Sequence, residues 1–131
     1  MTGKPPYPVQ RRYCRAEGQA GEDAWNTRNP EAVSLACTED SRWRNRSVFI
    51  NGRKEIVDFL THKWENELEY RLIKELWSFG GHRITVRFAY EYRTVNDDWF
   101  RAYGNENWEL SDDGLMSVRH TSINERFPTS R

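Results

Sequence analysis

Residues 70–92 read YRLIKELWSFGGHRITVRFAYEY, and this stretch decides the fold. On both sides of Gly80-Gly81, large apolar side chains alternate with other side chains, as they do in antiparallel strands joined by a tight turn. Two more alternating runs follow turn-rich segments, one from Trp99 to Leu110 and one from Leu115 to Ile123. The sequence therefore predicts four long antiparallel strands arranged as a meander.

Three helices are predicted ahead of these strands. The first runs from Val9 to Asn26, where a small residue recurs every four positions and predicts a closely packed face at Ala16, Ala20 and Ala24. The second starts at Asn29-Pro30-Glu31, residue types that favour a helix start, and runs through Cys37. The third follows a turn at Asn51-Gly52 and carries apolar residues at helical spacing, namely Ile56, Phe59, Leu60 and Trp64. Helices followed by a long antiparallel sheet predict an α+β fold in which the helices cover one face of a curved sheet.

Length and charge exclude several classes of function. The 131 residues suffice for one domain, which we place at residues 9–127 after an extended, proline-containing arm at residues 1–8. Twenty Lys plus Arg balance 20 Asp plus Glu, so the chain lacks the basic excess typical of nucleic-acid binding. No stretch is apolar and long enough to span a membrane, and the first residues lack the apolar core of a secretory signal. We expect a cytoplasmic protein that binds neither nucleic acid nor membrane.

Cysteine and histidine give no sign of a metal site. Cys14 and Cys37 lack the spacing of a metal motif, and we expect two reduced structural thiols. The three histidines also lack such spacing. We therefore expect neither a metal nor another cofactor.

The predicted turns also assign side chains to the two faces of the sheet, because residues opposite each other on antiparallel strands share a face. A two-residue turn at Gly80-Gly81 places Trp77 opposite Ile84 and Glu75 opposite Val86. A three-residue turn at residues 95–97 places Val86 opposite Glu106, and a four-residue turn at residues 111–114 places Glu106 opposite Arg119. The face beneath the helices is then predicted to carry Arg71, Ile73, Glu75, Trp77, Ile84, Val86, Phe88, Phe100, Glu106, Trp108 and Arg119. The outer face is predicted to carry Lys74, Arg87, Glu91, Arg101, Tyr103, Asn105, Asn107 and His120.

The charged residues of the predicted inner face have two interpretations. An isolated charge in an apolar interior costs several kcal/mol, so these groups must pair or serve a ligand. One interpretation is a structural network in which Glu75 pairs with Arg71 and Glu106 with Arg119. The other is a ligand pocket walled by Trp43, Trp77 and Trp108, in which the charges orient a bound molecule.

A family resemblance supports this architecture. Residues 38–92 and 100–124, with the motifs DAWNTRNPE, SRWRNR, YRLIKELW, RFAYEY and GNENWE, resemble an uncharacterised family of the nuclear transport factor 2-like, or SnoaL-like, superfamily. The resemblance covers about residues 23–124. It implies a cone-shaped fold, with a curved antiparallel sheet wrapped around three helices, and a homodimer formed through the outer face of the sheet.

The same resemblance argues against one known chemistry. Isomerase-like members of the superfamily carry a carboxylate base just before the loop into the third helix, and SRWRNRSVFINGRKEI places Asn45 there. Because Asn cannot accept the proton, the resemblance leaves Glu75 or Glu106 as candidate bases, provided that burial raises the pKa of one of them. None of His62, His82 and His120 has an evident carboxylate partner in the predicted pocket.

Three functional hypotheses follow. The first is a domain that binds a small polar or acidic molecule through Trp43, Asn45, Arg71, Trp77, Trp108 and Arg119. In it, the arginines bind an acidic group and the tryptophans stack on a ring. The second is a cofactor-independent lyase or isomerase with Glu75 or Glu106 as general acid or base. The third is a dimeric interaction module that works through the outer sheet face.

Overall fold

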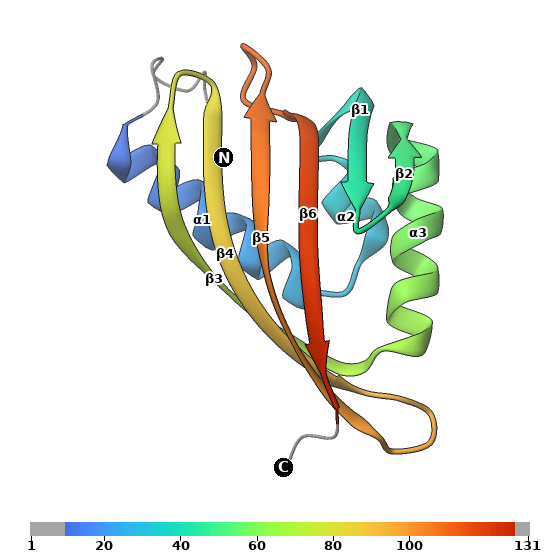
Figure 1. The fold of residues 1–131 in the computed structure, drawn as a ribbon. Helices are drawn as coiled ribbons and strands as arrows, with labels where there is room; N and C mark the ends of the chain where they lie inside the picture. Colours follow the sequence, from blue (N-terminus) through green and yellow to red (C-terminus); the bar gives the residue numbers. More distant parts are fainter. Residues whose placement is uncertain (1–9, 128–131) are drawn as a thin grey trace.

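The computed structural model describes residues 10–127 of the chain, so the predicted arm at residues 1–8 lies outside the described residues. Three helices and six strands follow one another in the order α1, α2, β1, β2, α3 and β3 to β6 (Figure 1). The helices are α1 (Arg11–Asn26), α2 (Pro30–Ser34) and α3 (Gly52–Asn66). The strands are β1 (Cys37–Asn45), β2 (Val48–Asn51), β3 (Leu68–Gly80), β4 (Arg83–Arg93), β5 (Trp99–Leu110) and β6 (Met116–Arg126). The predicted α+β class is confirmed.

The six strands form one strongly bent sheet in the order β2-β1-β6-β5-β4-β3 (Figure 1). The predicted meander of β3 to β6 is antiparallel throughout, whereas β1 pairs with β6 in parallel. Strands β1 and β2 come from a polar stretch in which alternation predicted no strand. Figure 1 shows the three helices on one side of the sheet. The interior of the fold therefore lies between the helices and this inner face.

Helix α1 packs on the sheet with a different face from the one predicted. Its buried residues are Cys14, Gly18 and Trp25. Of the three predicted alanines only Ala24 packs against the core, whereas Ala16 and Ala20 are exposed, so the predicted alanine face is wrong. The helix also covers the open edge of β3. The Asn26 side chain accepts from the Leu72 N–H at 2.8 Å and donates to its carbonyl at 2.9 Å. These bonds satisfy edge groups that would otherwise be open to another strand.

The shorter helices follow their sequence signals more closely. The Asn29 side chain caps α2 by accepting from the Ala32 N–H at 3.2 Å, and Pro30 stands at the first helical position. Helix α2 ends at Ser34, because residues from Cys37 onward already form β1. Helix α3 starts at Gly52, whose positive φ of 81° suits glycine, and buries its predicted residues Ile56 and Leu60.

The register of β3 differs from the prediction. Gly80 pairs with Arg83, so the turn consists of Gly81-His82, and a bulge follows between Leu76 and Ser78. Beyond the bulge, Glu75 lies opposite Arg87 and Leu76 opposite Val86. A shift of one residue reverses the face of every side chain. The predicted inward orientation of the odd-numbered residues Arg71 to Trp77 is therefore wrong, and Lys74 points inward instead.

The other two hairpins are closer to expectation. The register of β4 and β5 is as predicted, with Val86 opposite Glu106 and Ile84 opposite Trp108. In β5 and β6 the pairing is offset by two residues, so Arg119 lies opposite Trp108 rather than Glu106. An even offset keeps each side chain on its face. Glu106, Trp108 and Arg119 therefore share the inner face, as predicted.

Candidate functional site

A buried ion cluster centred on Glu106 of β5 occupies the middle of the inner face. The Lys74 Nζ donates to Glu106 Oε1 at 2.8 Å, and the Trp108 Nε1 donates to the same oxygen at 2.8 Å. The Arg119 guanidinium donates to Glu106 Oε2 through Nε at 3.1 Å and also through Nη2. All three charged side chains are at most 3% exposed. Three strands, β3, β5 and β6, thus contribute one charge each to a site without solvent.

Aromatic rings surround the two cations of this cluster. The Arg119 guanidinium carbon lies 4.6 Å from the ring centroids of both Trp25 and Trp43. The Lys74 Nζ lies 5.2 Å from the Trp25 centroid and 5.0 Å from the Trp108 centroid. Such contacts attract a desolvated cation to the ring faces. They offset part of the cost of burying the charges.

The cluster carries more positive than negative charge. Lys74 and Arg119 both pair with one carboxylate, Glu106, so these three groups carry one positive charge in excess when all are ionised. Glu22 of α1 also attracts Lys74 without pairing with its ammonium. In addition, the Arg119 Nη1 is buried without a hydrogen-bond partner among residues 10–127. Of the two cations, Lys74 lines a ligand-sized pocket, whereas Arg119 borders only a cavity of about 10 Å³. The arrangement is therefore suited to an additional anion or carbonyl oxygen beside Lys74.

The pKa values follow from burial and from this imbalance. Burial alone would raise the pKa of Glu106, but Arg119 and Lys74 lower it to about 2. Burial lowers the pKa of Lys74, and the attraction of Glu106 offsets this only in part. At neutral pH Glu106 is therefore ionised, and its lowered pKa makes it a weak proton acceptor, whereas the role of general base proposed from the sequence required a raised pKa. The ion more easily neutralised is Lys74.

A pocket of about 390 Å³ opens beside the cluster, between α1, α2 and the turn that joins β5 to β6. Lys74 and Glu17 are its two charged residues. The remaining lining is largely apolar and comprises Ala20, Gly21, Ala24, Trp25, Val33, Leu35, Ala36, Cys37, Trp43, Trp108, Leu110, Gly114, Leu115 and Met116. An apolar pocket of this size with few charged groups is typical of small-molecule sites.

Glu17, like Lys74, is an ionisable group of this pocket that sequence reasoning missed. It stands on α1 one turn before Gly21, where an added Cβ would lie 3.7 Å from the Lys74 Nζ. Its Oε1 is buried without a hydrogen-bond partner in the described part of the chain. Burial raises the pKa of Glu17, and a hydrogen bond with the Tyr13 side chain counteracts this only partly. No local sequence pattern distinguishes Glu17 from a surface glutamate, because its place in the pocket depends on which face of α1 packs on the sheet.

A second, smaller cavity of about 10 Å³ lies deeper in the cone and is lined by Arg119, Asn45, Lys63 and two tyrosines, Tyr70 and Tyr90. It is large enough for about one water molecule. Lys63 is buried there and donates to Glu67 Oε1 at 2.8 Å. Asn45, predicted to occupy the position of the isomerase base, thus faces this cavity rather than the larger pocket.

The structure brings together five of the eight predicted site residues. Trp43, Asn45, Glu106, Trp108 and Arg119 are all buried on the inner side of the sheet.

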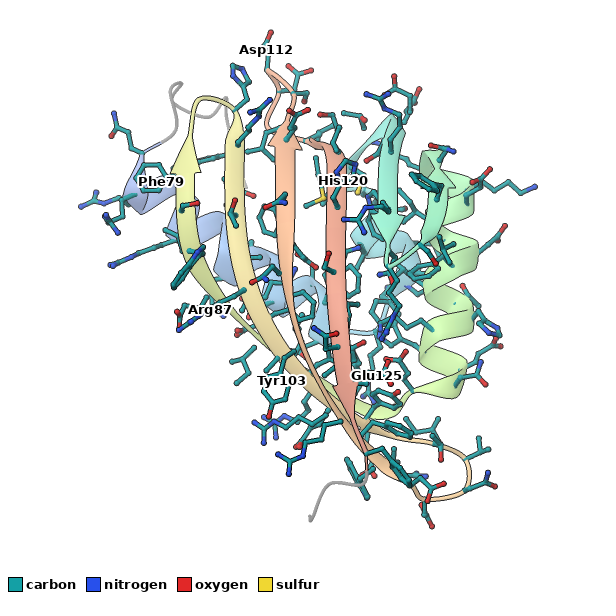
Figure 2. All side chains as sticks on the ribbon, viewed as in Figure 1. Phe79, Arg87, Tyr103, Asp112, His120 and Glu125 are labelled. Carbon is teal, nitrogen blue, oxygen red and sulfur yellow. The ribbon has the colours of Figure 1, made fainter. Side chains whose placement is uncertain are left out.

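Three predicted site residues lie on the outer face. Glu75 is exposed and pairs with Arg87 at 2.7 Å, and Figure 2 shows Arg87 on the side of the sheet away from the helices. Trp77 is 62% exposed and packs its ring against Arg87, 4.7 Å from the guanidinium carbon. Arg71 is exposed and lies opposite Glu91. Their predicted places in the pocket are wrong because of the register of β3.

The three histidines lie away from the pocket. His82 contacts Asp112 at 3.0 Å at one end of the sheet, His120 is on the outer face, and His62 is exposed on α3 (Figure 2). Both cysteines are buried as free thiols. Within residues 10–127 no group of His, Cys, Asp and Glu side chains is arranged to hold a metal ion. Nor does any helix in this range have the length and apolar character needed to cross a membrane.

Solved structures identify the fold as nuclear transport factor 2-like. An NTF2-like protein of unknown function from Burkholderia pseudomallei K96243 matches with a TM-score of 0.73 at 19% identity, over 85% of this chain and 91% of that chain. A SnoaL-like protein from Shewanella denitrificans OS-217 matches with a TM-score of 0.74 at 13% identity, over 87% and 92%. A protein with a ketosteroid isomerase-like fold from Catenulispora acidiphila DSM 44928, solved with trimethylamine, matches with a TM-score of 0.72 at 13% identity, over 79% and 82%.

The chain belongs to the family described as protein of unknown function DUF1348, whose model it matches over residues 5–129. No curated protein matches the chain. At identities below 20%, the similar structures establish the fold and no activity.

Proposed function

We propose that the protein binds a small organic molecule in the pocket of about 390 Å³, with an acidic or carbonyl group of the molecule against Lys74. The observation that carries the proposal is the buried cluster of Lys74, Glu106 and Arg119, which holds one positive charge in excess at the wall of an apolar pocket. Uncompensated buried charge is costly, and an anionic ligand would remove that cost.

The walls of the pocket support a ligand with an apolar body. Trp25, Trp43 and Trp108 present indole rings to it, and Leu35 and Leu115 line it near the helices and the turn. Aromatic rings gain most from contact with flat or apolar groups. The favoured ligand is therefore a monocarboxylate or a carbonyl compound with a ring or short alkyl chain.

The proposal can be tested by tryptophan fluorescence, because three of the six tryptophans line the pocket. We expect some members of a panel of aromatic and aliphatic monocarboxylates to change the emission of the protein in a saturable way. Lys74→Met, which removes the charge and keeps most of the length, should weaken that binding by about tenfold or more, since a charge-assisted hydrogen bond contributes about 1.5 to 3 kcal/mol. The control is Lys54→Met, at an exposed lysine of α3. Equal affinities in the two variants would contradict the proposal.

A cofactor-independent lyase or isomerase is the second candidate function, and Glu17 favours it. A carboxyl group with a raised pKa and a buried, unpartnered oxygen in a pocket is suited to exchange protons with a bound molecule. In this proposal Glu17 takes the role first given to Glu75 or Glu106. Exchange of substrate hydrogens with deuterated water, followed by NMR over the panel, tests it. Glu17→Gln should abolish exchange, and exchange that persists in this variant would contradict the role.

We also propose a homodimer through the outer sheet face. That face exposes Ile73, Trp77 and Tyr103, three large side chains that a partner could cover. Light scattering after size exclusion should give the mass of two chains, and Trp77→Glu should shift the protein toward one chain. A stable monomer at high concentration would contradict the dimer and an interaction role based on it.

A further inference from the structure

Lys74 differs from the other charges of its cluster because Glu106 and Arg119 already balance each other without it. Without a proton on Lys74, Glu106 keeps the guanidinium of Arg119 and the Nε1 of Trp108 as donors. One carboxylate then faces one cation, and the excess charge is gone. Loss of the Lys74 proton therefore removes a buried charge without leaving a carboxylate unpaired.

Burial and Arg119 favour the neutral form of Lys74, because burial removes the hydration of the ammonium and Arg119 repels it. Glu106, Glu22 of α1 and the indole faces of Trp25 and Trp108 attract the ammonium. The pKa of Lys74 is nevertheless lowered, so burial and the repulsion by Arg119 outweigh these attractions. A lysine that is desolvated and next to another cation is the kind of amine that acts as a nucleophile.

We propose that Lys74 forms an imine with an aldehyde or ketone bound in the pocket. The proposal rests on the proposed binding function and makes it more specific, because it restricts the ligand to carbonyl compounds. The Nζ first loses one ammonium proton, and the neutral amine attacks the carbonyl carbon to form a C–N bond. The carbonyl oxygen takes up that proton and a second one from the nitrogen, the C–O bond breaks, and the oxygen leaves as water. Starting from the ammonium, the product is a protonated imine, so charge is conserved. The nitrogen, which lies 2.8 Å from Glu106 Oε1 before the reaction, therefore remains a cation beside that carboxylate.

Lys63 provides an internal comparison. It is also buried, and burial lowers its pKa too. However, Lys63 borders the cavity of about 10 Å³, which leaves room for a water molecule but none for a carbonyl compound. Burial and a lowered pKa are therefore common to both lysines, and the adjoining pocket distinguishes Lys74.

The test uses the wild-type protein with butanal and sodium cyanoborohydride near pH 7, followed by peptide mass spectrometry. Reduction converts an imine to a stable butyl-lysine. We expect Lys74 to be labelled severalfold faster than the exposed Lys54, and Lys63 to stay unlabelled. The tightest carboxylate from the fluorescence panel should slow the labelling of Lys74 and leave that of Lys54 unchanged. Lys74→Arg should lose the fast label.

The outcomes separate this proposal from the binding function. Saturable ligand binding together with no labelling of Lys74 would overturn the imine and leave the binding site standing. Labelling of Lys63 as fast as Lys74 would also overturn it, since opening of the fold rather than the pocket would then explain both. Absence of both ligand binding and Lys74 labelling would overturn both proposals. Fast, competed labelling of Lys74 alone supports both.

Discussion

Glu106 and Glu75 are carboxylates of the same sheet, and each pairs with an arginine, but on opposite faces. Glu106 is 2% exposed and accepts from Lys74, Trp108 and Arg119. Glu75 has a side chain that is 60% exposed, and its pair with Arg87 lies in solvent. The two pairs join the same chemical groups and differ in their exposure to solvent. Water stabilises the outer charges by itself, whereas the inner charges depend entirely on one another.

The largest expected effect is the removal of the inner carboxylate. Glu106→Gln would leave two buried cations without a counter-charge, and breaking such a pair costs about 3 to 5 kcal/mol. Glu75→Gln should cost less than about 1 kcal/mol, because exposed pairs contribute little. Urea unfolding followed by tryptophan fluorescence measures both. Similar losses in the two variants would mean that the two faces do not differ as described.

Lowering the pH should also destabilise the protein, because protonation of Glu106 removes the same negative charge. The pKa of Glu106 falls from 4.5 to about 2 on folding, so the folded state binds protons less readily than the unfolded state. The resulting stability is fully present above about pH 4.5 and is lost as the pH falls toward 2. It amounts to roughly 3 kcal/mol, at about 1.4 kcal/mol per pKa unit. Unfolding free energies measured between pH 5 and 2.5 should show this slope in the wild type and a shallower one in Glu106→Gln.

Lys74→Met should be tolerated better than Glu106→Gln. The carboxylate keeps Arg119 and Trp108, and methionine fills the apolar surroundings of the lost stem. Replacing a redundant buried ion by an apolar side chain is often close to neutral, so we expect a change within about 1 to 2 kcal/mol. A loss as large as that of Glu106→Gln, in the same urea experiment, would show that Lys74 is needed to balance Glu106.

The smallest expected effect concerns two glycines of α1. Gly18→Ala and Gly21→Ala should each raise stability by up to about 1 kcal/mol, because alanine favours a helix. A Cβ at Gly18 would meet Val86 at 4.0 Å, whereas one at Gly21 would lie 3.4 Å from Trp108 and 3.7 Å from the Lys74 Nζ. Only Gly21→Ala should therefore weaken ligand binding in the fluorescence titration. Equal affinity in both variants would place the ligand elsewhere.

Much of this fold could be predicted from the sequence, because alternation and helical spacing report burial directly. The meander, the third helix and the inward Glu106 and Arg119 follow from such patterns. The side chains of β3 that point inward could not be predicted in this way, since its odd-numbered and its even-numbered positions both carry apolar residues. Ile73 and Trp77 are large enough to suggest an interior, yet they are exposed, and Leu72 and Leu76 lie inside with Lys74.

The pocket itself was harder to predict than its charges. Its lining joins α1, α2 and the turn after β5, and no local pattern connects these segments. Glu17 resembles any surface glutamate in a helix until the packing of Gly18, Gly21 and Trp25 on the sheet is known. Sequence patterns therefore identified a charged interior and missed the lysine and the glutamate that border its open space.

The bulge at Trp77 also affects how the chain can change in length. Leu76 pairs with Val86 and Ser78 pairs with Thr85, so Trp77 is an extra residue of β3 that has no partner in β4. Deleting Trp77 would leave the pairings on both sides of the bulge intact, with Lys74 still directed inward. The edge strand can thus lose a residue at this point without altering which side chains line the pocket. Evolution can vary the outer surface here, by deletion as well as by substitution, while the interior chemistry stays constant.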